Sequence, residues 1–133
     1  MDKLLEQIGL LGILPVAIVD DEKKALTLAQ TLCGSGMPAI EVTFRTQAAA
    51  SVIEQIAKDS PHMLLGAGTV LTIDQARTAI NAGARFIVSP GFSPKVIEFC
   101  LSKSIPIIPG ISTPTEIQNA IEYNLEVVKF FPA

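Results

Sequence analysis

Short apolar runs recur along this chain at nearly regular intervals. Consecutive runs start roughly 20 to 26 residues apart. Each run is rich in β-branched residues and ends in a turn signal, as strands buried on both faces do. Helical periodicity marks the segments between them, which predicts alternating strands and helices. The runs begin at Gly12, Pro38, Met63, Arg85, Ile105 and Glu126.

Capping signals predict where several helices begin and end. Thr113 to Glu116 has the spacing of a capping box with proline at the first helical position, and Thr72 to Gln75 forms a second box. Ser93 followed by Pro94 repeats the order of cap and proline. Glycines in the segments 33–38 and 81–85 are expected to end the preceding helices. An additional helix is expected at about residues 2 to 9.

The predicted order of elements is α-(βα)5-β within an α/β fold. Such units build either an open doubly wound sheet or a closed (βα)8 barrel. A complete barrel uses roughly 200 to 250 residues, whereas this chain has 133. No linker or low-complexity segment divides it. We therefore expect residues 1–133 to form a single, incomplete domain of the (βα)8 TIM-barrel family that stops after its sixth strand.

Composition narrows the classes of function. No stretch approaches the ~18 uncharged apolar residues of a membrane-spanning helix, although hydrophobic residues make up 49% of the chain. The first residues carry Asp2 and Glu6 and lack the basic start of a secretory signal. A net charge of −3 gives no electrostatic attraction to nucleic acid or anionic membranes. We expect a cytoplasmic protein that binds neither.

The cysteines and the histidine restrict metal and redox chemistry. Cys33 and Cys100 lie far apart in helix-like segments, so we expect both to be reduced, buried thiols. His62 is the only histidine and precedes a strand, which indicates a surface or capping role. A zinc site built on several histidines is excluded within this chain, and no metal cofactor is expected.

Lys129 lies within the apolar run 126–132, near the expected end of the last strand. Reactive groups of barrel folds lie at such strand ends. An apolar surround disfavours the charged ammonium, and a neutral amine attacks carbonyl groups to form a Schiff base. The alternative is a lysine whose head reaches solvent at the strand end. The residues alone leave both interpretations open.

Glu41, Thr43 and Arg45 alternate along the second predicted strand and therefore share one face. An acid between Ile40 and Val42 is costly unless it is paired or used. One interpretation is a structural ion pair between Glu41 and Arg45. The other is a general acid/base at Glu41, with Arg45 holding an anionic substrate.

Three further strand ends offer groups that can complete a small site. Thr69 follows the sequence Gly-Ala-Gly, which is not a dinucleotide fingerprint because Leu71 occupies the place of the third glycine. The glycines let the backbone approach another group closely. Thr69 is either a donor to a carboxylate or a simple turn residue. Pro90 and Phe131 either wall a small site or belong to the core.

The candidate residues supply a nucleophilic amine, an acid, an arginine and a hydroxyl at neighbouring strand ends. These groups provide for attack on a carbonyl, proton transfer and carboxylate recognition. They suit retro-aldol cleavage of a 2-oxo acid, in which an iminium accepts the electrons of the breaking C3–C4 bond. Protonation of the resulting enamine then releases pyruvate.

These motifs resemble the class I 2-keto-3-deoxy-6-phosphogluconate (KDPG) and 4-hydroxy-2-oxoglutarate (KHG) aldolases. The resemblance covers essentially the whole chain. Its segments are GMPAIEVTFR at 36–45, GAGTVLT at 66–72, SPG at 89–91, IPGISTPTE at 108–116 and VVKFFPA at 127–133. One small departure is Asn124, where the family usually has glycine; asparagine also tolerates the left-handed backbone conformation.

The resemblance implies a role for each candidate residue. Lys129 would form the Schiff base, and Glu41 would act as acid/base through a water. Arg45 and Thr69 would hold the pyruvyl carboxylate. Pro90 and Phe131 would line the pocket. It also implies a homotrimer that needs no metal or other cofactor and acts on KDPG, KHG or both.

The resemblance also implies a longer chain than this one. Family members continue for roughly another half-chain, where loops after strands 7 and 8 bind phosphate. We therefore expect a truncated or incompletely recorded chain. One alternative is a catalytically incompetent N-terminal fragment that acts only by self-association. Another is a phosphate-binding barrel with isomerase or synthase chemistry.

Overall fold

The computed structural model describes residues 2–133 and has the predicted order α-(βα)5-β. All pairs of neighbouring strands are parallel. The strands are β1 (Val16–Ala17), β2 (Ala39–Thr43), β3 (Leu64–Gly68), β4 (Phe86–Ser89), β5 (Ile107–Ile111) and β6 (Lys129–Phe130). The helices are α1 (Lys3–Leu11), α2 (Glu22–Gly34), α3 (Ala49–Asp59), α4 (Ile73–Ala82), α5 (Pro94–Ser102) and α6 (Pro114–Glu122).

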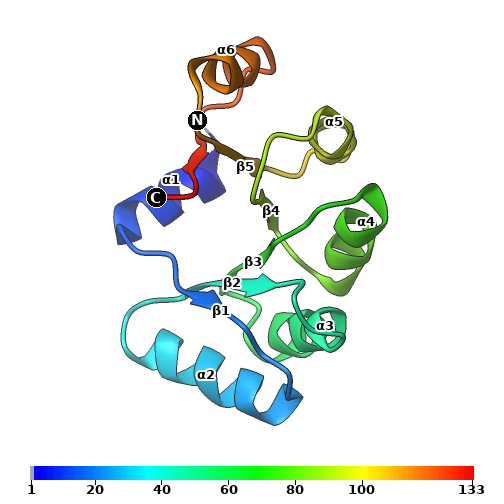
Figure 1. Ribbon diagram of the computed structural model, residues 1–133. Helices are drawn as coiled ribbons and strands as arrows, with labels where there is room; N and C mark the ends of the chain where they lie inside the picture. The colour runs from blue at the N-terminus through cyan, green and yellow to red at the C-terminus, as the bar shows by residue number, and fades with distance from the viewer. Residues whose placement is uncertain (1) are drawn as a thin grey trace.

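The order of the strands distinguishes a barrel arc from a doubly wound sheet. Each strand pairs with the next one along the chain, so the sheet runs β1-β2-β3-β4-β5-β6 without a reversal. A doubly wound sheet reverses its order at a switch point. Figure 1 shows α2, α3, α4 and α5 along one side of the curved sheet, with α1 on the other side near the C-terminus. The architecture is therefore part of a TIM-type barrel, as predicted.

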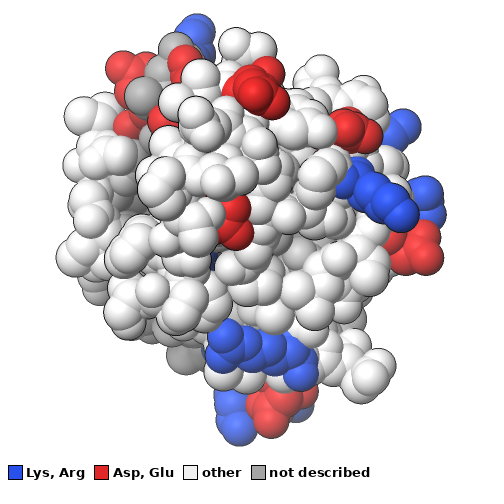
Figure 2. All heavy atoms as spheres, turned by 45° about the horizontal axis from the view of Figure 1, so that its top comes forward, with Lys and Arg blue, Asp and Glu red and all other residues white. Residues whose placement is uncertain are grey.

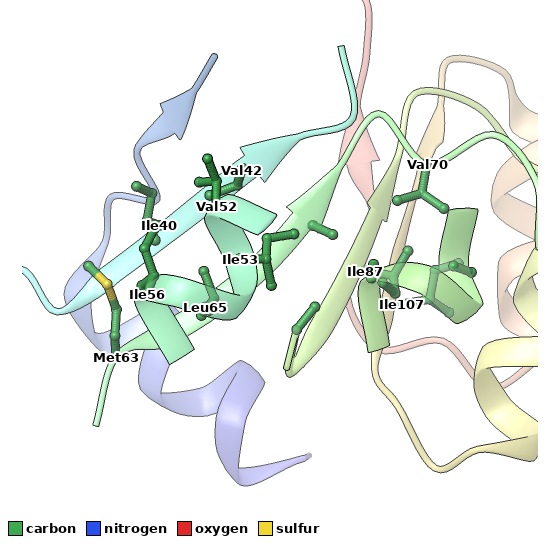
Figure 3. Packing of buried hydrophobic residues seen from close by; sticks show 14 of the residues in the cluster. Ile40, Val42, Val52, Ile53, Ile56, Met63, Leu65, Val70, Ile87 and Ile107 are labelled. Atoms are coloured by element: carbon green, nitrogen blue, oxygen red, sulfur yellow. The ribbon is translucent and has the colours of Figure 1, made fainter. Parts of the chain in front are cut away.

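The larger hydrophobic core fills the space between the sheet and its outer helices. Residues Ile40 and Val42 of β2 face Val52, Ile53 and Ile56 of α3, all without exposed surface (Figure 3). Strands β2 to β5 are buried along their whole length, as expected for strands covered on both faces.

The two end strands depart from that expectation. β1 and β6 each pair with a single neighbour and have only two residues. Val16 of β1 is 56% exposed and Phe130 of β6 is 65% exposed. The prediction of full burial is wrong for these strands, because the described chain places no further strand beside them.

A second core covers the inner face of the sheet near the start of the strands. It contains side chains from β2 to β5 together with α1. Its buried members are Leu4, Ala39, Leu64, Phe86, Val88 and Ile108. Leu5, Ile8 and Leu11 of α1 pack against this cluster. Helix α1 therefore covers the inner face at the end opposite to the candidate site.

Most of the predicted helix boundaries are confirmed. Thr113 and Glu116 form a complete capping box, and the Thr72 hydroxyl accepts a hydrogen bond from the Gln75 amide at 3.2 Å. Gly83 ends α4 in the left-handed conformation. Ser93 makes no capping hydrogen bond through its side chain, so α5 begins on the fixed φ of proline alone.

The expectations for cysteine and histidine are confirmed in part. Both cysteines are free thiols, and Cys100 is buried against the outer core, where burial raises the pKa of its thiol to about 11. Cys33 is exposed instead of buried, because it lies on the outward face of the last turn of α2. His62 is exposed in the turn before β3, as expected.

Charged residues make up only 17% of the chain, and they are correspondingly sparse on its surface. On the face drawn in Figure 2, basic and acidic side chains lie mainly along the margins, around a broad white area that is interrupted near its centre by an acidic side chain. Among residues 2–133, no helix is both long and apolar enough to cross a bilayer.

Truncating Ile53 tests the outer core. Ile53 has no exposed surface, so Ile53→Ala should lower the free energy of unfolding by about 2 to 5 kcal/mol. The matched control is the next residue on α3, Glu54, whose exposed pair with Lys58 spans 2.8 Å. Glu54→Ala should cost less than about 1 kcal/mol. Urea unfolding measures both, and equal costs would contradict this packing.

Candidate active site

Alternation along β2 directs Glu41 to the inner face of the sheet. Ile40 and Val42 belong to the outer core, whereas Ala39 belongs to the inner one. Glu41 therefore points inward, as Thr43 does, and they are 3% and 0% exposed. Arg45 lies in the turn that follows β2 and is exposed. The prediction that Glu41, Thr43 and Arg45 share one face of the strand is thus confirmed for Glu41 and Thr43. Arg45 lies beyond the end of the strand.

The Glu41 carboxyl is buried without a hydrogen-bond partner for Oε1. Burial raises its pKa above the ordinary value, and the positive charges of Lys129 and Arg45 oppose that rise. No ion pair joins Glu41 to Arg45 in the described chain. The structural ion-pair interpretation is therefore wrong. A buried, unpaired carboxyl is costly, which is typical of a group retained for chemistry.

Lys129 approaches the same inner face from β6. It pairs with Gly110 of β5 and is half-buried, and its Nζ lies 4.6 Å from the centroid of the Phe131 ring. Its neighbours Val128 and Phe130 are 37% and 65% exposed. Strand alternation turns these two residues away, so they do not enclose the amine. The Phe131 ring is its aromatic contact.

Thr69 occupies an unusual backbone position directly after β3. Its φ is +55°, in the left-handed region that β-branched residues rarely adopt. Such a conformation costs of order 1 to 3 kcal/mol and is found mainly at functional sites. Thr69 is half-buried. Ser104 and Asn124 have the same φ in turns at the opposite end of the strands.

Pro90 and Phe131 lie at the carboxyl ends of β4 and β6. Pro90 is half-buried, and its carbonyl oxygen occupies the space where Gly110 of β5 lacks a side chain. Phe131 is 37% exposed and precedes a cis peptide bond to Pro132. Phe131 therefore does not belong to the buried core, whereas Pro90 packs its backbone against β5.

Gly66 and Gly68 of β3 allow the close approach that their spacing predicts. A Cβ on Gly66 would overlap the Phe86 ring, and a Cβ on Gly68 would overlap the Glu41 carboxyl. The Gly-Ala-Gly spacing predicts a close approach, because it leaves two inner-face positions of β3 without side chains. The spacing does not identify the groups that approach, which are the Phe86 ring and the Glu41 carboxyl.

Two further features of the described chain bear on ligand binding. A cavity of about 260 Å³ is lined by Leu5, Ser104 and Asn124, among others, at the opposite end of the strands. Asn124 has a φ of +55°, which confirms that it tolerates the left-handed conformation. Within residues 2–133, no three His, Cys, Asp or Glu side chains are grouped as metal ligands.

The raised pKa of Glu41 predicts the sign of a pH effect. The folded state holds this proton more tightly than the unfolded state, whose carboxyl has a pKa near 4.5. Stability contributed by this residue should therefore fall as pH rises through that value. Glu41→Gln removes the titration, so its stability relative to wild type should increase as the pH rises above about 4.

Urea unfolding at several pH values measures this difference. Exposed Glu54 provides the control, and Glu54→Gln should show no such trend. A relative stability of Glu41→Gln that stays level or falls with pH would contradict the burial of an unpaired carboxyl.

Comparison with known proteins agrees with this arrangement. A family described as "KDPG and KHG aldolase" matches residues 4–133. The chain is 47% identical over 133 residues to the 2-dehydro-3-deoxy-phosphogluconate aldolase of Treponema pallidum, covering 100% of this chain and 63% of that protein. It is 40% identical over 131 residues to the corresponding aldolase of Haemophilus influenzae, covering 98% and 62%.

A solved structure of KDPG aldolase from Legionella pneumophila superposes with a TM-score of 0.86 at 36% identity. That structure contains pyruvate captured as a covalent carbinolamine intermediate. The match covers 90% of this chain and 58% of that one. The chain thus spans less than two thirds of the length of these relatives. Its sequence, its arc of βα units and its matches together show that it belongs to the KDPG and KHG aldolase family.

Proposed function

We propose that Lys129 and Glu41 are the nucleophile and the acid/base of a class I aldolase that acts on 2-oxo acids. The observation that carries this proposal is geometric: the Glu41 carboxyl of β2 is buried with no hydrogen-bond partner for Oε1, on the inner face that Lys129 of β6 also meets. The positive charge of Lys129 opposes the rise that burial causes in the pKa of Glu41. The two residues lie 88 positions apart in the sequence.

The proposed reaction begins at the amine. In its neutral form, Lys129 Nζ attacks the C2 carbonyl of the substrate, and loss of water gives an iminium. Glu41 accepts the proton of the C4 hydroxyl, and the C3–C4 bond breaks as its electrons move into the iminium. The products of this step are an aldehyde and an enamine bound to Lys129.

The proton held by Glu41 then goes to C3 of the enamine, and hydrolysis of the iminium releases pyruvate. A single carboxyl can accept and return this proton because its pKa is raised by burial. The cleaved aldehyde is glyceraldehyde 3-phosphate from KDPG or glyoxylate from KHG. The proton passes between Glu41 and the substrate through a water.

The other candidate residues would hold the pyruvyl end. Arg45, exposed at the rim after β2, supplies a guanidinium for the carboxylate. Thr69 offers its hydroxyl from a strained backbone position. Phe131 packs beside the amine, and Pro90 forms the wall next to β5. No metal is needed for this route, because the iminium itself accepts the electrons.

The assembly and location follow the family resemblance. We propose that the protein forms a homotrimer in the cytoplasm, where the free thiols Cys33 and Cys100 stay reduced. Light scattering on the purified chain tests the trimer. A folded chain that associates but never forms an imine would favour the alternative of a catalytically incompetent protein that acts by self-association.

Trapping with borohydride tests the nucleophile. Wild type incubated with pyruvate and borohydride should gain one pyruvate-derived adduct in an intact-mass spectrum, because borohydride reduces the iminium to a stable amine. Lys129→Ala should gain none. Lys95→Ala, which removes an exposed lysine of α5, should label as wild type does.

Circular dichroism shows whether each sample is folded. A folded wild type without an adduct would contradict the proposed activity of this chain. An adduct that persists in Lys129→Ala would contradict the assignment of the nucleophile.

Replacing Thr69 by glycine separates binding from stability. Glycine adopts a φ of +55° freely, so Thr69→Gly should not lower the unfolding free energy. It removes the hydroxyl, so the pyruvate concentration for half-maximal trapping should rise about tenfold. Asn124→Gly is the matched control, because Asn124 has the same φ far from the site. Asn124→Gly should leave the pyruvate concentration for half-maximal trapping unchanged. If Thr69→Gly also leaves it unchanged, Thr69 does not bind the carboxylate.

A further inference from the structure

Three glycines in the strands lie where another group has taken the place of a side chain. A Cβ would overlap the Phe86 ring at Gly66, the Glu41 carboxyl at Gly68 and the Pro90 carbonyl at Gly110. Most glycines outside the strands differ, since a Cβ on Gly9, Gly34 or Gly91 would meet nothing within 4 Å; the exception is Gly83, where a Cβ would lie 2.7 Å from the Cβ of Ala57. Gly68 is the member of this group that touches a proposed reacting residue.

The register shows how the Glu41 side chain reaches Gly68. Glu41 pairs with Gly66, whereas Gly68 pairs with Thr43, one inner-face position further along. The side chain of Glu41 therefore leans along the strands toward their carboxyl ends and crosses β3. Its Cγ, Cδ and Oε1 atoms are the three atoms nearest to the missing Cβ of Gly68.

The backbone around Gly68 is fixed on both sides. Its carbonyl oxygen accepts a hydrogen bond from the Phe44 amide at 2.8 Å. Two residues later, the Val70 amide donates to the Val88 carbonyl at 3.2 Å. The turn between them passes through Thr69 at φ +55°. A side chain at position 68 would therefore displace the flexible carboxyl before it displaces the strand.

We propose that Gly68 is a positioning residue for Glu41, because the missing side chain forms the notch in which the carboxyl is buried. The inference rests on the acid/base role proposed for Glu41, and it adds a requirement at a residue with no functional group. Any larger residue at position 68 would turn the carboxyl out of the notch, away from the position in which it transfers a proton.

A double-mutant cycle of unfolding free energies at positions 68 and 41 tests whether the space at Gly68 holds the Glu41 carboxyl, and it requires no catalytic activity. Gly68→Ala should shift the unfolding equilibrium toward the unfolded state by roughly tenfold or more, because the added methyl overlaps Cγ as well as the carboxyl of Glu41 and the whole side chain must change its rotamer. In a Glu41→Ala background the same substitution should cost far less, because the carboxyl is gone. If Gly68→Ala alone does not fold, the double variant should still fold.

Gly66→Ala is the matched control on the same face of the same strand. Its overlap is with the Phe86 ring, so Glu41→Ala should not relieve its cost and Phe86→Leu should. A cost of Gly68→Ala that is the same with and without the Glu41 carboxyl would overturn the proposal. So would a double variant that fails to fold.

The pKa of the Glu41 carboxyl, measured by titration, does not change when a substitution merely destabilises the fold. Carbon-13 NMR of labelled glutamate, assigned with Glu41→Gln, should show a raised pKa in wild type and a value closer to the ordinary one in Gly68→Ala. Turning the carboxyl into solvent removes the desolvation that raises the pKa. An unchanged pKa in Gly68→Ala would overturn the proposal.

Borohydride trapping of pyruvate separates this inference from the proposed function. If wild type forms the adduct and Glu41→Ala does not relieve the cost of Gly68→Ala, then Gly68 does not position Glu41 but the aldolase assignment stands. If the cycle succeeds and wild type forms no adduct, the notch is real but the proposed activity of this chain is wrong.

Discussion

The parallel hydrogen-bonded register from β1 to β6 is the constraint on which the rest of the structure depends. It fixes which residues of each strand face the helices and which face inward. Ile40 and Val42 enter the outer core, so Glu41 between them must enter the inner face. A shift of β2 by one residue would bury two aliphatic side chains in the site and place the acid against α3. The apolar packing thus enforces the burial of Glu41.

The burial of this carboxyl in turn organises the candidate site. Its Oε1 has no hydrogen-bond partner, and the charges that favour its ionised form come from Lys129 and Arg45. Gly68 provides the space that the carboxyl fills. Thr69 keeps a strained backbone at the end of the same strand. The unpartnered Oε1 and the backbone of Thr69 both cost stability, and their position at the same end of the sheet is the physical reason to regard that end as functional.

The sequence predicts the periodic features of this protein well. The order of βα units, the inward position of Glu41 and the capping box at Thr113 follow from local patterns that the structure retains. The contacts between strands are harder to predict. The apolar neighbours of Lys129 suggested an enclosed amine, but alternation turns Val128 and Phe130 outward.

The relation between Glu41 and Arg45 shows a second limit of sequence reasoning. Their spacing allowed an ion pair, and it did not reveal that Arg45 falls in the turn beyond β2. The exposure of Cys33 was missed for a related reason, since a helical pattern alone does not say which face a terminal turn presents. The partners of Gly66 and Gly68 depend on the register between strands, which no local pattern contains.

The central claim is that Lys129 and Glu41 act on the same bound 2-oxo acid. Deuterium exchange into the methyl group of pyruvate, followed by proton NMR, tests this claim most directly because it needs both the imine and the acid/base. Wild type should catalyse the exchange and Lys129→Ala should not. Glu41→Gln should still form the borohydride-trapped adduct and lose exchange by at least about 100-fold. Exchange at the wild-type rate in Glu41→Gln would contradict the account.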